Sequence, residues 1–145
     1  MQPSFLPDPA QLSRIMSEAM APAFVLGAVA GFVSILLGRL TAVVDRIRSL
    51  NDVSDDDHGR THLKSDIPRL RRRAELLSKA AHLALFSGMC VGLLLIVGFA
   101  CAYLRLEHIY GAALLFILGV ALLVAALFKF GQEVRIGLSE ADHYR

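Results

Sequence analysis

Three long apolar runs constrain what this chain can fold into more than any other feature. They cover residues 21–40, 80–104 and 109–128, and Arg39 is their only charged residue, one position from the end of the first. At about 1.5 Å per residue, helices of this length cross the roughly 30 Å hydrocarbon layer of a bilayer, provided that the Arg39 side chain extends to the interface. A soluble domain of 145 residues rarely gathers its apolar residues in this way. The sequence predicts an all-α integral membrane protein with three transmembrane helices.

Positive charge is distributed unevenly about these runs. Arg14 and Arg105 stand on one side. The remaining basic residues lie between the first two runs or after the third: Arg39, Arg46, Arg48, Arg60, Lys64, Arg69, Arg71, Arg72, Arg73, Lys79, Lys129, Arg135 and Arg145. Because basic segments stay in the cytoplasm, residues 41–79 and a tail of residues 129–145 are expected to be cytoplasmic and the N-terminus outside.

The segment before the first run has the pattern of a short amphipathic helix. Asp8 caps it, Pro9 occupies its first turn, and apolar residues recur at helical spacing: Leu12, Ile15, Met16, Ala19 and Met20. This pattern predicts a helix over residues 9–20 that lies on the outer membrane surface. The chain as a whole, residues 1–145, is expected to form a single membrane domain.

Residues 41–79 carry a coiled-coil-like pattern on both sides of a polar stretch. Apolar residues alternate spacings of four and three, leaving the first run and then entering the second: Leu36, Leu40, Val43, Ile47 and Leu50, then Ile67, Leu70, Ala74, Leu77, Ala81 and Ala84. Such spacing is typical of a seam between packed helices. It predicts that the first two transmembrane helices extend into a cytoplasmic antiparallel hairpin, with Pro68 in the first turn of its second helix.

Two sets of residues are candidates for contacts with lipid or with other helices. Arg69, Arg71, Arg72 and Arg73 lie near the second span, where they either contact anionic lipid headgroups or serve only as a positive-inside signal. Gly27 with Gly31, and Gly88 with Gly92, form two GxxxG pairs. Such pairs let helix backbones approach closely, within one subunit or between subunits.

The sequence contains no recognisable motif for catalysis or metal binding. The acidic turn around Asp52 and Asp57 lacks the glycine and the final glutamate of a calcium loop. Cys90 and Cys101 stand about 16 Å apart along one helix, and neither has zinc ligands at suitable spacing. There is no phosphate-binding loop or hydrolase motif, and no acidic or basic residue lies near the middle of a span. We expect a protein without catalytic residues, cofactor, metal site or nucleic-acid partner, and Ser87 is expected to bond its own helix backbone.

Three stretches outside the apolar runs resemble a bacterial three-helix membrane family, domain of unknown function 2721. They are RLTAVVDRIRSL (39–50), RLRRRAELL (69–77) and QEVRIGLS (132–139), and the resemblance covers roughly residues 10–140. It implies a bacterial inner-membrane protein of this topology, with family-pattern positions at Asp45, Arg46, Arg48, Glu133 and Arg135. It implies no activity.

Charged residues at these positions are candidates for an ion-pair cluster where the helices leave the membrane. Asp45 is expected to pair with Arg48, and Glu133 with Arg135 or Arg39, which would fix the exit angles of the three helices. The alternative is that these charges are separately solvated, since exposed ion pairs contribute little.

The expected role is therefore assembly: a non-enzymatic membrane protein that acts as a homo-oligomer or as an accessory subunit of a larger complex. The alternative is an oligomeric ion channel with a basic cytoplasmic mouth, because a passive pore needs no charge buried in its spans. Its partners would be the bilayer, including anionic lipids, and other copies of itself.

Overall fold

The described part of the chain is entirely helical. The computed structural model describes residues 9–52, 61–104 and 109–141, which form α1 (Pro9–Asn51), the 3₁₀ helix η1 (Thr61–Asp66), α2 (Ile67–Leu104) and α3 (Ile109–Ala141). Three of these helices are long and apolar enough to cross a membrane. The prediction of an all-α fold with three helices able to span a membrane is confirmed.

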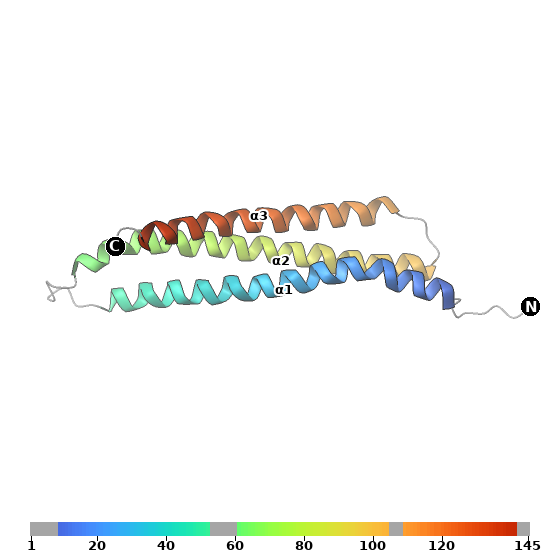
Figure 1. Cartoon of the computed structure of the whole chain (residues 1–145), viewed down its shortest axis with the longest axis horizontal. Coiled ribbons are helices and arrows are strands. Elements are labelled where there is room, and N and C mark those ends of the chain that lie inside the picture. Colours follow the sequence, from blue (N-terminus) through green and yellow to red (C-terminus); the bar gives the residue numbers. More distant parts are fainter. Residues whose placement is uncertain (1–8, 53–60, 105–108, 142–145) are drawn as a thin grey trace, which may run out of the picture.

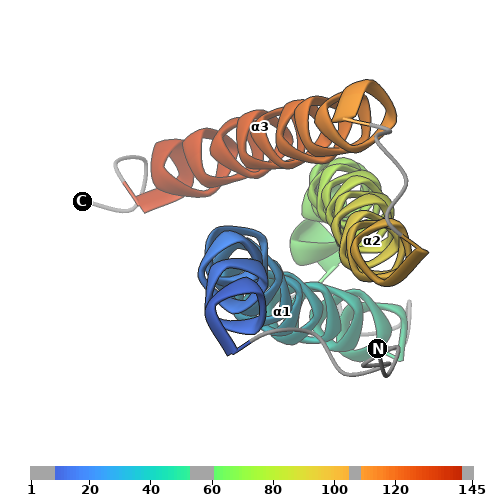
Figure 2. The same ribbon diagram turned by 90° about the vertical axis from the view of Figure 1, so that its right-hand side faces the viewer.

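The three long helices lie side by side, with α2 in contact with both others (Figure 1). α1 and α2 run antiparallel, as do α2 and α3. Viewed along the bundle, α1 and α3 diverge from each other while α2 stays close to both (Figure 2). The position of α3 is therefore determined mainly by α2, and α1 and α3 meet over only a short stretch.

The hairpin seam forms as the spacing predicts. All the predicted seam residues belong to one apolar cluster, in which Leu36, Val43 and Leu50 of α1 are buried against Leu70, Leu77 and Ala81 of α2. The small side chains of Ala80, Ala81 and Ala84, all fully or nearly fully buried, let α1 approach α2 closely. α2 begins at Ile67, so Pro68 lies in its first turn as predicted, where its missing N–H has no helical acceptor to lose.

The predicted surface helix over residues 9–20 is not a separate element. These residues are the first part of α1, which continues without a break to Asn51 and contains Pro22. Proline removes one backbone hydrogen bond and crowds the preceding turn, which bends a helix more readily than it ends one when the flanking sequence favours helix. α1 curves in this N-terminal part (Figure 1). Asp8 lies outside the described residues.

The predicted tail is also helical as far as Ala141. Lys129 ends the apolar run, but α3 continues through it for about three more turns. Phe130 packs against the apolar cluster of the hairpin and Glu133 is fully buried. These two contacts hold residues 129–138 on the other helices. The ends of the three helices on this side, residues 39–51, 67–79 and 129–138, are called the hairpin end.

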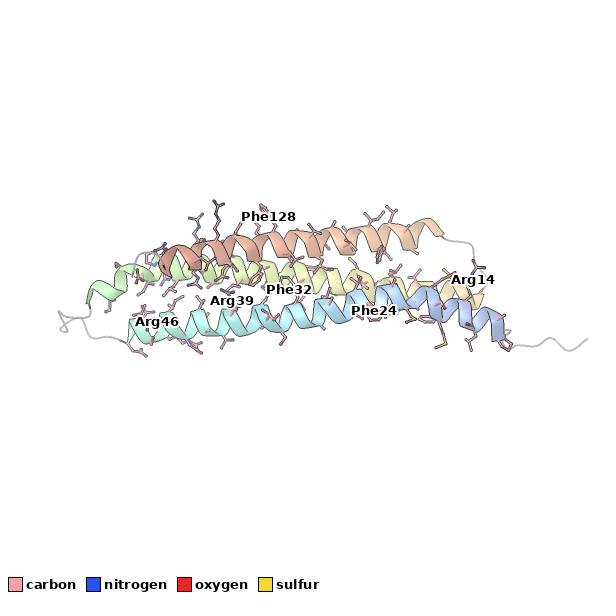
Figure 3. The ribbon with its side chains drawn as sticks, viewed as in Figure 1. Arg14, Phe24, Phe32, Arg39, Arg46 and Phe128 are labelled. Carbon is pink, nitrogen blue, oxygen red and sulfur yellow. The ribbon has the colours of Figure 1, made fainter. Side chains whose placement is uncertain are left out.

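Large apolar side chains cover the outside of the bundle. Phe24, Ile96 and Phe128 are each exposed over two thirds or more of their surface. Figure 3 shows Phe128 on the side of α3 that faces away from the other helices. In water such a surface would drive aggregation, whereas in a bilayer it contacts acyl chains. Helix association then depends on close packing and polar contacts rather than on the hydrophobic effect.

Candidate functional site: a buried ion cluster

Glu133 is the one charged side chain that the described structure buries completely. A lone carboxylate in such a place would cost several kcal/mol, so it requires compensating positive charge. α3 brings it to the inner side of the bundle at the hairpin end, four residues beyond Lys129. Two arginines from the other two helices surround it.

Arg73 of α2 makes the tighter of the two contacts. Its Nη2 lies 2.9 Å from Oε1 of Glu133, its Nε donates a hydrogen bond of 3.0 Å to the same oxygen, and its side chain is 15% exposed. Gly137, one turn beyond Glu133, makes room for this guanidinium: a Cβ atom there would lie 3.1 Å from Nη2 of Arg73. The absence of a side chain at Gly137 is thus part of the site.

Arg39 of α1 makes the looser contact. Its Nη2 lies 3.2 Å from Oε2 of Glu133 and donates a hydrogen bond of 3.4 Å to Oε1, and its side chain is 38% exposed. Oε2 itself is buried and accepts no hydrogen bond of good geometry from the described residues, so the contact at Oε2 is purely ionic.

An aromatic pair supports Arg39 from the apolar side. The guanidinium carbon lies 5.2 Å from the centre of the Phe130 ring, within the range of a cation–π contact. Phe32 of α1 meets the same ring edge-to-face, with centroids 5.6 Å apart and planes at 78°. α1 and α3 therefore touch through an aromatic pair, a cation–π contact and an ion pair, and the site joins all three helices.

The structure brings together some of the charged residues predicted at the helix exits. Arg39 contacts Glu133, and Asp45 lies 3.6 Å from Arg48 on the exposed side of α1. Arg46 and Arg135 are exposed and form no ion pair with the described residues. The Asp45–Arg48 pair contributes little, because both side chains are more than half exposed.

Arg73 occupies a different environment from the one expected for the arginine run. Arg69, Arg71 and Arg72 are exposed, as contact with headgroups requires, but Arg73 faces inward to Glu133. Adjacent residues on a helix point in different directions, so one member of a run turns inward readily. The sequence did not predict the Arg73–Glu133 pair, because the two residues are sixty positions apart and nothing near either of them indicates the other.

Glycines mark the close contacts between helices, and of the four glycines in the predicted pairs Gly88 makes such a contact. Gly88 packs on α1, where a Cβ would lie 3.2 Å from Val29, and Gly119 packs on α2, 3.1 Å from Val91. For Gly27, Gly31 and Gly92, no neighbouring heavy atom lies within 4 Å of the Cβ position.

Ser87 differs from expectation as well. Its buried hydroxyl donates a hydrogen bond of 2.7 Å across to the carbonyl of Gly119, instead of bonding its own helix. The small residue on α3 exposes its carbonyl to α2, and this allows the interhelical bond.

The register of these contacts places at one level the three basic residues found where the apolar runs end on this side, Arg39, Lys79 and Lys129. Val29 of α1 lies opposite Gly88 of α2, so in this antiparallel pair Arg39, ten residues farther along α1, lies opposite Ser78. In the same way, the Ser87–Gly119 contact places Lys129 of α3 opposite Leu77 of α2. Arg39 and Lys129 are thus within about 3 Å of Lys79 along the bundle, at 1.5 Å per residue. Glu133 lies about one turn beyond this level, at the boundary between the apolar runs and the polar hairpin end.

The chemistry available at this site is that of charge pairing. Two guanidinium groups and one carboxylate leave a net charge of +1. Within the described ranges no group of His, Cys, Asp or Glu is arranged to hold a metal ion, and most of the acidic turn, residues 53–60, lies outside those ranges.

Comparison with known proteins gives the family. A family model described as "Protein of unknown function (DUF2721)" matches residues 19–143. No curated protein and no solved structure matches the chain. Since the family match extends over far more than half of the chain, the protein belongs to the DUF2721 family, as the residues around Asp45 and Glu133 indicated.

Proposed function

We propose that this protein is a non-enzymatic component of the bacterial inner membrane that works by assembly with further copies of itself. The observation that carries the proposal is the position of Gly27 and Gly31. They lie on the exposed side of α1, with no heavy atom of another helix within 4 Å of either Cβ position. Glycine has no side chain to pack against lipid, whereas a glycine pair that faces another helix lets the two backbones come into contact.

Gly38 extends the same stripe toward the hairpin end, eleven and seven residues beyond the pair, and it is equally open. Residues separated by four, seven and eleven positions share one helix face. The stripe therefore covers more than two turns of α1 and is long enough for a second helix to follow. A second α1 helix related by two-fold symmetry fits, because both sides of such an interface are the same surface.

The native mass of the purified protein in mild detergent tests assembly. We expect a discrete oligomer that Gly27→Ile together with Gly31→Ile reduces to the monomer. Gly98→Ile, an equally open position on α2, is the matched control and should leave the mass unchanged. A monomeric wild type would contradict self-assembly, and a foreign chain at fixed stoichiometry would make the protein an accessory subunit.

The proposed orientation places the hairpin end in the cytoplasm and the N-terminus outside. The excess of lysine and arginine in residues 39–79 and after residue 128 supports it. Lys79, Lys129 and Arg39 then lie at the cytoplasmic interface, where the side chains reach the headgroup region.

An oligomeric ion pore with a basic mouth is the second candidate, and the structure favours it less. Arg39 and Arg73, which would contribute to a charge ring, both contact Glu133 inside one subunit. Conductance across a planar bilayer distinguishes the two roles: ion currents whose selectivity changes in Arg46→Gln would favour the pore, and an electrically silent oligomer would favour assembly.

A further inference from the structure

We propose that Arg39 binds the phosphate of an anionic phospholipid in the leaflet that contacts the hairpin end. The proposal rests on membrane insertion and is independent of assembly. Its basis is the unequal use of the two arginines that surround Glu133.

The Glu133 carboxylate engages Arg73 more fully than Arg39. Arg73 directs two nitrogens at one carboxylate oxygen, at 2.9 and 3.0 Å, and is 15% exposed. Arg39 contributes only Nη2, at 3.2 and 3.4 Å, and is 38% exposed. The single negative charge of Glu133 is thus shared between two positive charges. The positive charge that it does not neutralise lies mainly on Arg39, which is the more exposed of the two arginines.

Arg39 also has unused hydrogen-bond donors. A guanidinium carries five N–H groups in a planar fork that matches phosphate oxygens. Only Nη2 of Arg39 contacts an acceptor among the described residues, which leaves Nε and Nη1 available. Phe130 beneath the plane and Glu133 at one edge restrain the group, so binding a phosphate requires little further ordering.

The level of Arg39 in the bundle suits a lipid headgroup. Arg39 follows twenty residues without an acidic or basic side chain and is the first charge after the apolar part of α1. Lys129 of α3 ends its own run at the same level and adds positive potential there, whereas Lys79 of α2, also at this level, is paired with Glu75. By contrast Arg72 lies seven residues, about 10 Å, farther from the apolar run than Lys79. Arg39 is thus better placed for lipid than the exposed members of the arginine run.

Thermal unfolding in phosphatidylcholine nanodiscs, with and without phosphatidylglycerol, tests the proposal. We expect phosphatidylglycerol to raise the unfolding temperature of the wild type by a few degrees and that of Arg39→Gln not at all. Arg46→Gln is the matched control, because it removes the same charge from α1 two turns farther out. It should retain the full shift.

Equal shifts in Arg39→Gln and the wild type would overturn the proposal, as would a shift lost in Arg46→Gln as well. Inorganic phosphate without phosphatidylglycerol is the third arm, and a shift of the same size there would identify a soluble anion instead of a lipid.

If Arg39→Gln fails to fold, the proposal is tested with Arg39→Lys, whose bound phosphatidylglycerol is compared with that of the wild type by native mass spectrometry. Lysine keeps the charge but lacks the fork, so fewer bound phosphatidylglycerol molecules per chain are expected. Unchanged retention would overturn the proposal. The same spectra report the number of subunits, so a monomeric protein that retains lipid at Arg39 would contradict assembly alone.

Discussion

At the scale of single residues, the site depends on one carboxylate and on the space beside it. Glu133 joins Arg39 and Arg73, and Gly137 leaves room for the second of these. The family resemblance marked Glu133 and allowed its pairing with Arg39 to be predicted, but no pattern in the sequence indicated Arg73 or Gly137 as its neighbours. The importance of Glu133 and Gly137 comes from contacts between helices, and each can be tested by one substitution.

Replacing Glu133 by Gln should destabilise the bundle strongly. The change leaves two arginines close together without a counter-charge, and removing one partner of a buried ion pair costs about 3–5 kcal/mol. Denaturation in detergent measures the loss. Glu18→Gln, which breaks an exposed pair with Arg14, should change stability by less than about 1 kcal/mol, and equal effects of the two variants would contradict the assigned burial.

Replacing Gly137 by Ala should lower stability even though alanine is the better helix former. The new methyl group would lie 3.1 Å from Nη2 of Arg73, so the guanidinium has to shift by a few tenths of an ångström, and we expect its contact with Glu133 to weaken. Gly131, also on α3, has open space at its Cβ position, so Gly131→Ala should gain up to about 1 kcal/mol from helix propensity alone. The unfolding midpoints of the two variants should therefore move in opposite directions. A higher midpoint in both would show that Arg73 does not need the space beside Gly137 to pair with Glu133.

The exposed pair of Glu75 and Lys79 predicts a pH dependence of known sign. The hydrogen bond from Lys79, at 2.6 Å, holds the pKa of Glu75 below its ordinary value. A carboxyl whose pKa is lower in the folded state stabilises above its unfolded pKa, and this contribution disappears as the pH falls through the folded pKa. Wild type should melt slightly above Glu75→Gln at pH 7, and their midpoints should converge in acid. A difference that persists at pH 2 would rule out this origin.

At the scale of helices, the α1–α2 seam was predictable and the limits of the helices were less so. Alternating spacings of four and three repeat over two stretches of sequence, and every residue that this periodicity predicted belongs to the apolar cluster. Ala80, which is fully buried in the same cluster, lies outside the repeat and was not predicted. The end of the N-terminal helix was wrongly placed because Pro22 is accommodated inside α1. The helical extent of α3 beyond Lys129 depends on Phe130 and Glu133 meeting residues far away in sequence, which one sequence does not reveal.

Shortening Leu77 should separate buried seam positions from lipid-facing ones. Leu77 is fully buried between α1 and α2, so Leu77→Ala should leave a cavity and cost about 2–5 kcal/mol. Leu85, on the same helix, is 51% exposed and faces outward. Leu85→Ala should have a much smaller effect in the same detergent unfolding assay, and equal losses would contradict the packing of the seam.

At the scale of the whole molecule, the orientation and the membrane boundary can be measured together. In a variant with Cys90 and Cys101 replaced by Ala, a cysteine at Ser49 should react with an impermeant thiol reagent only after the inner membrane is opened. A cysteine at Ile35, on the apolar part of α1, should remain unreactive in both cases. Labelling of the Ser49 variant in intact spheroplasts would reverse the proposed orientation.

The shared level of Arg39, Lys79 and Lys129 has a mechanical consequence. α1, α2 and α3 each continue twelve residues past that level, so three unbroken rods protrude together by about 18 Å. The ion pairs of Glu133 with Arg39 and Arg73 join the three helices near the start of this protruding part. We therefore expect a force applied to the protruding ends to be shared among the three helices through the contacts of Glu133.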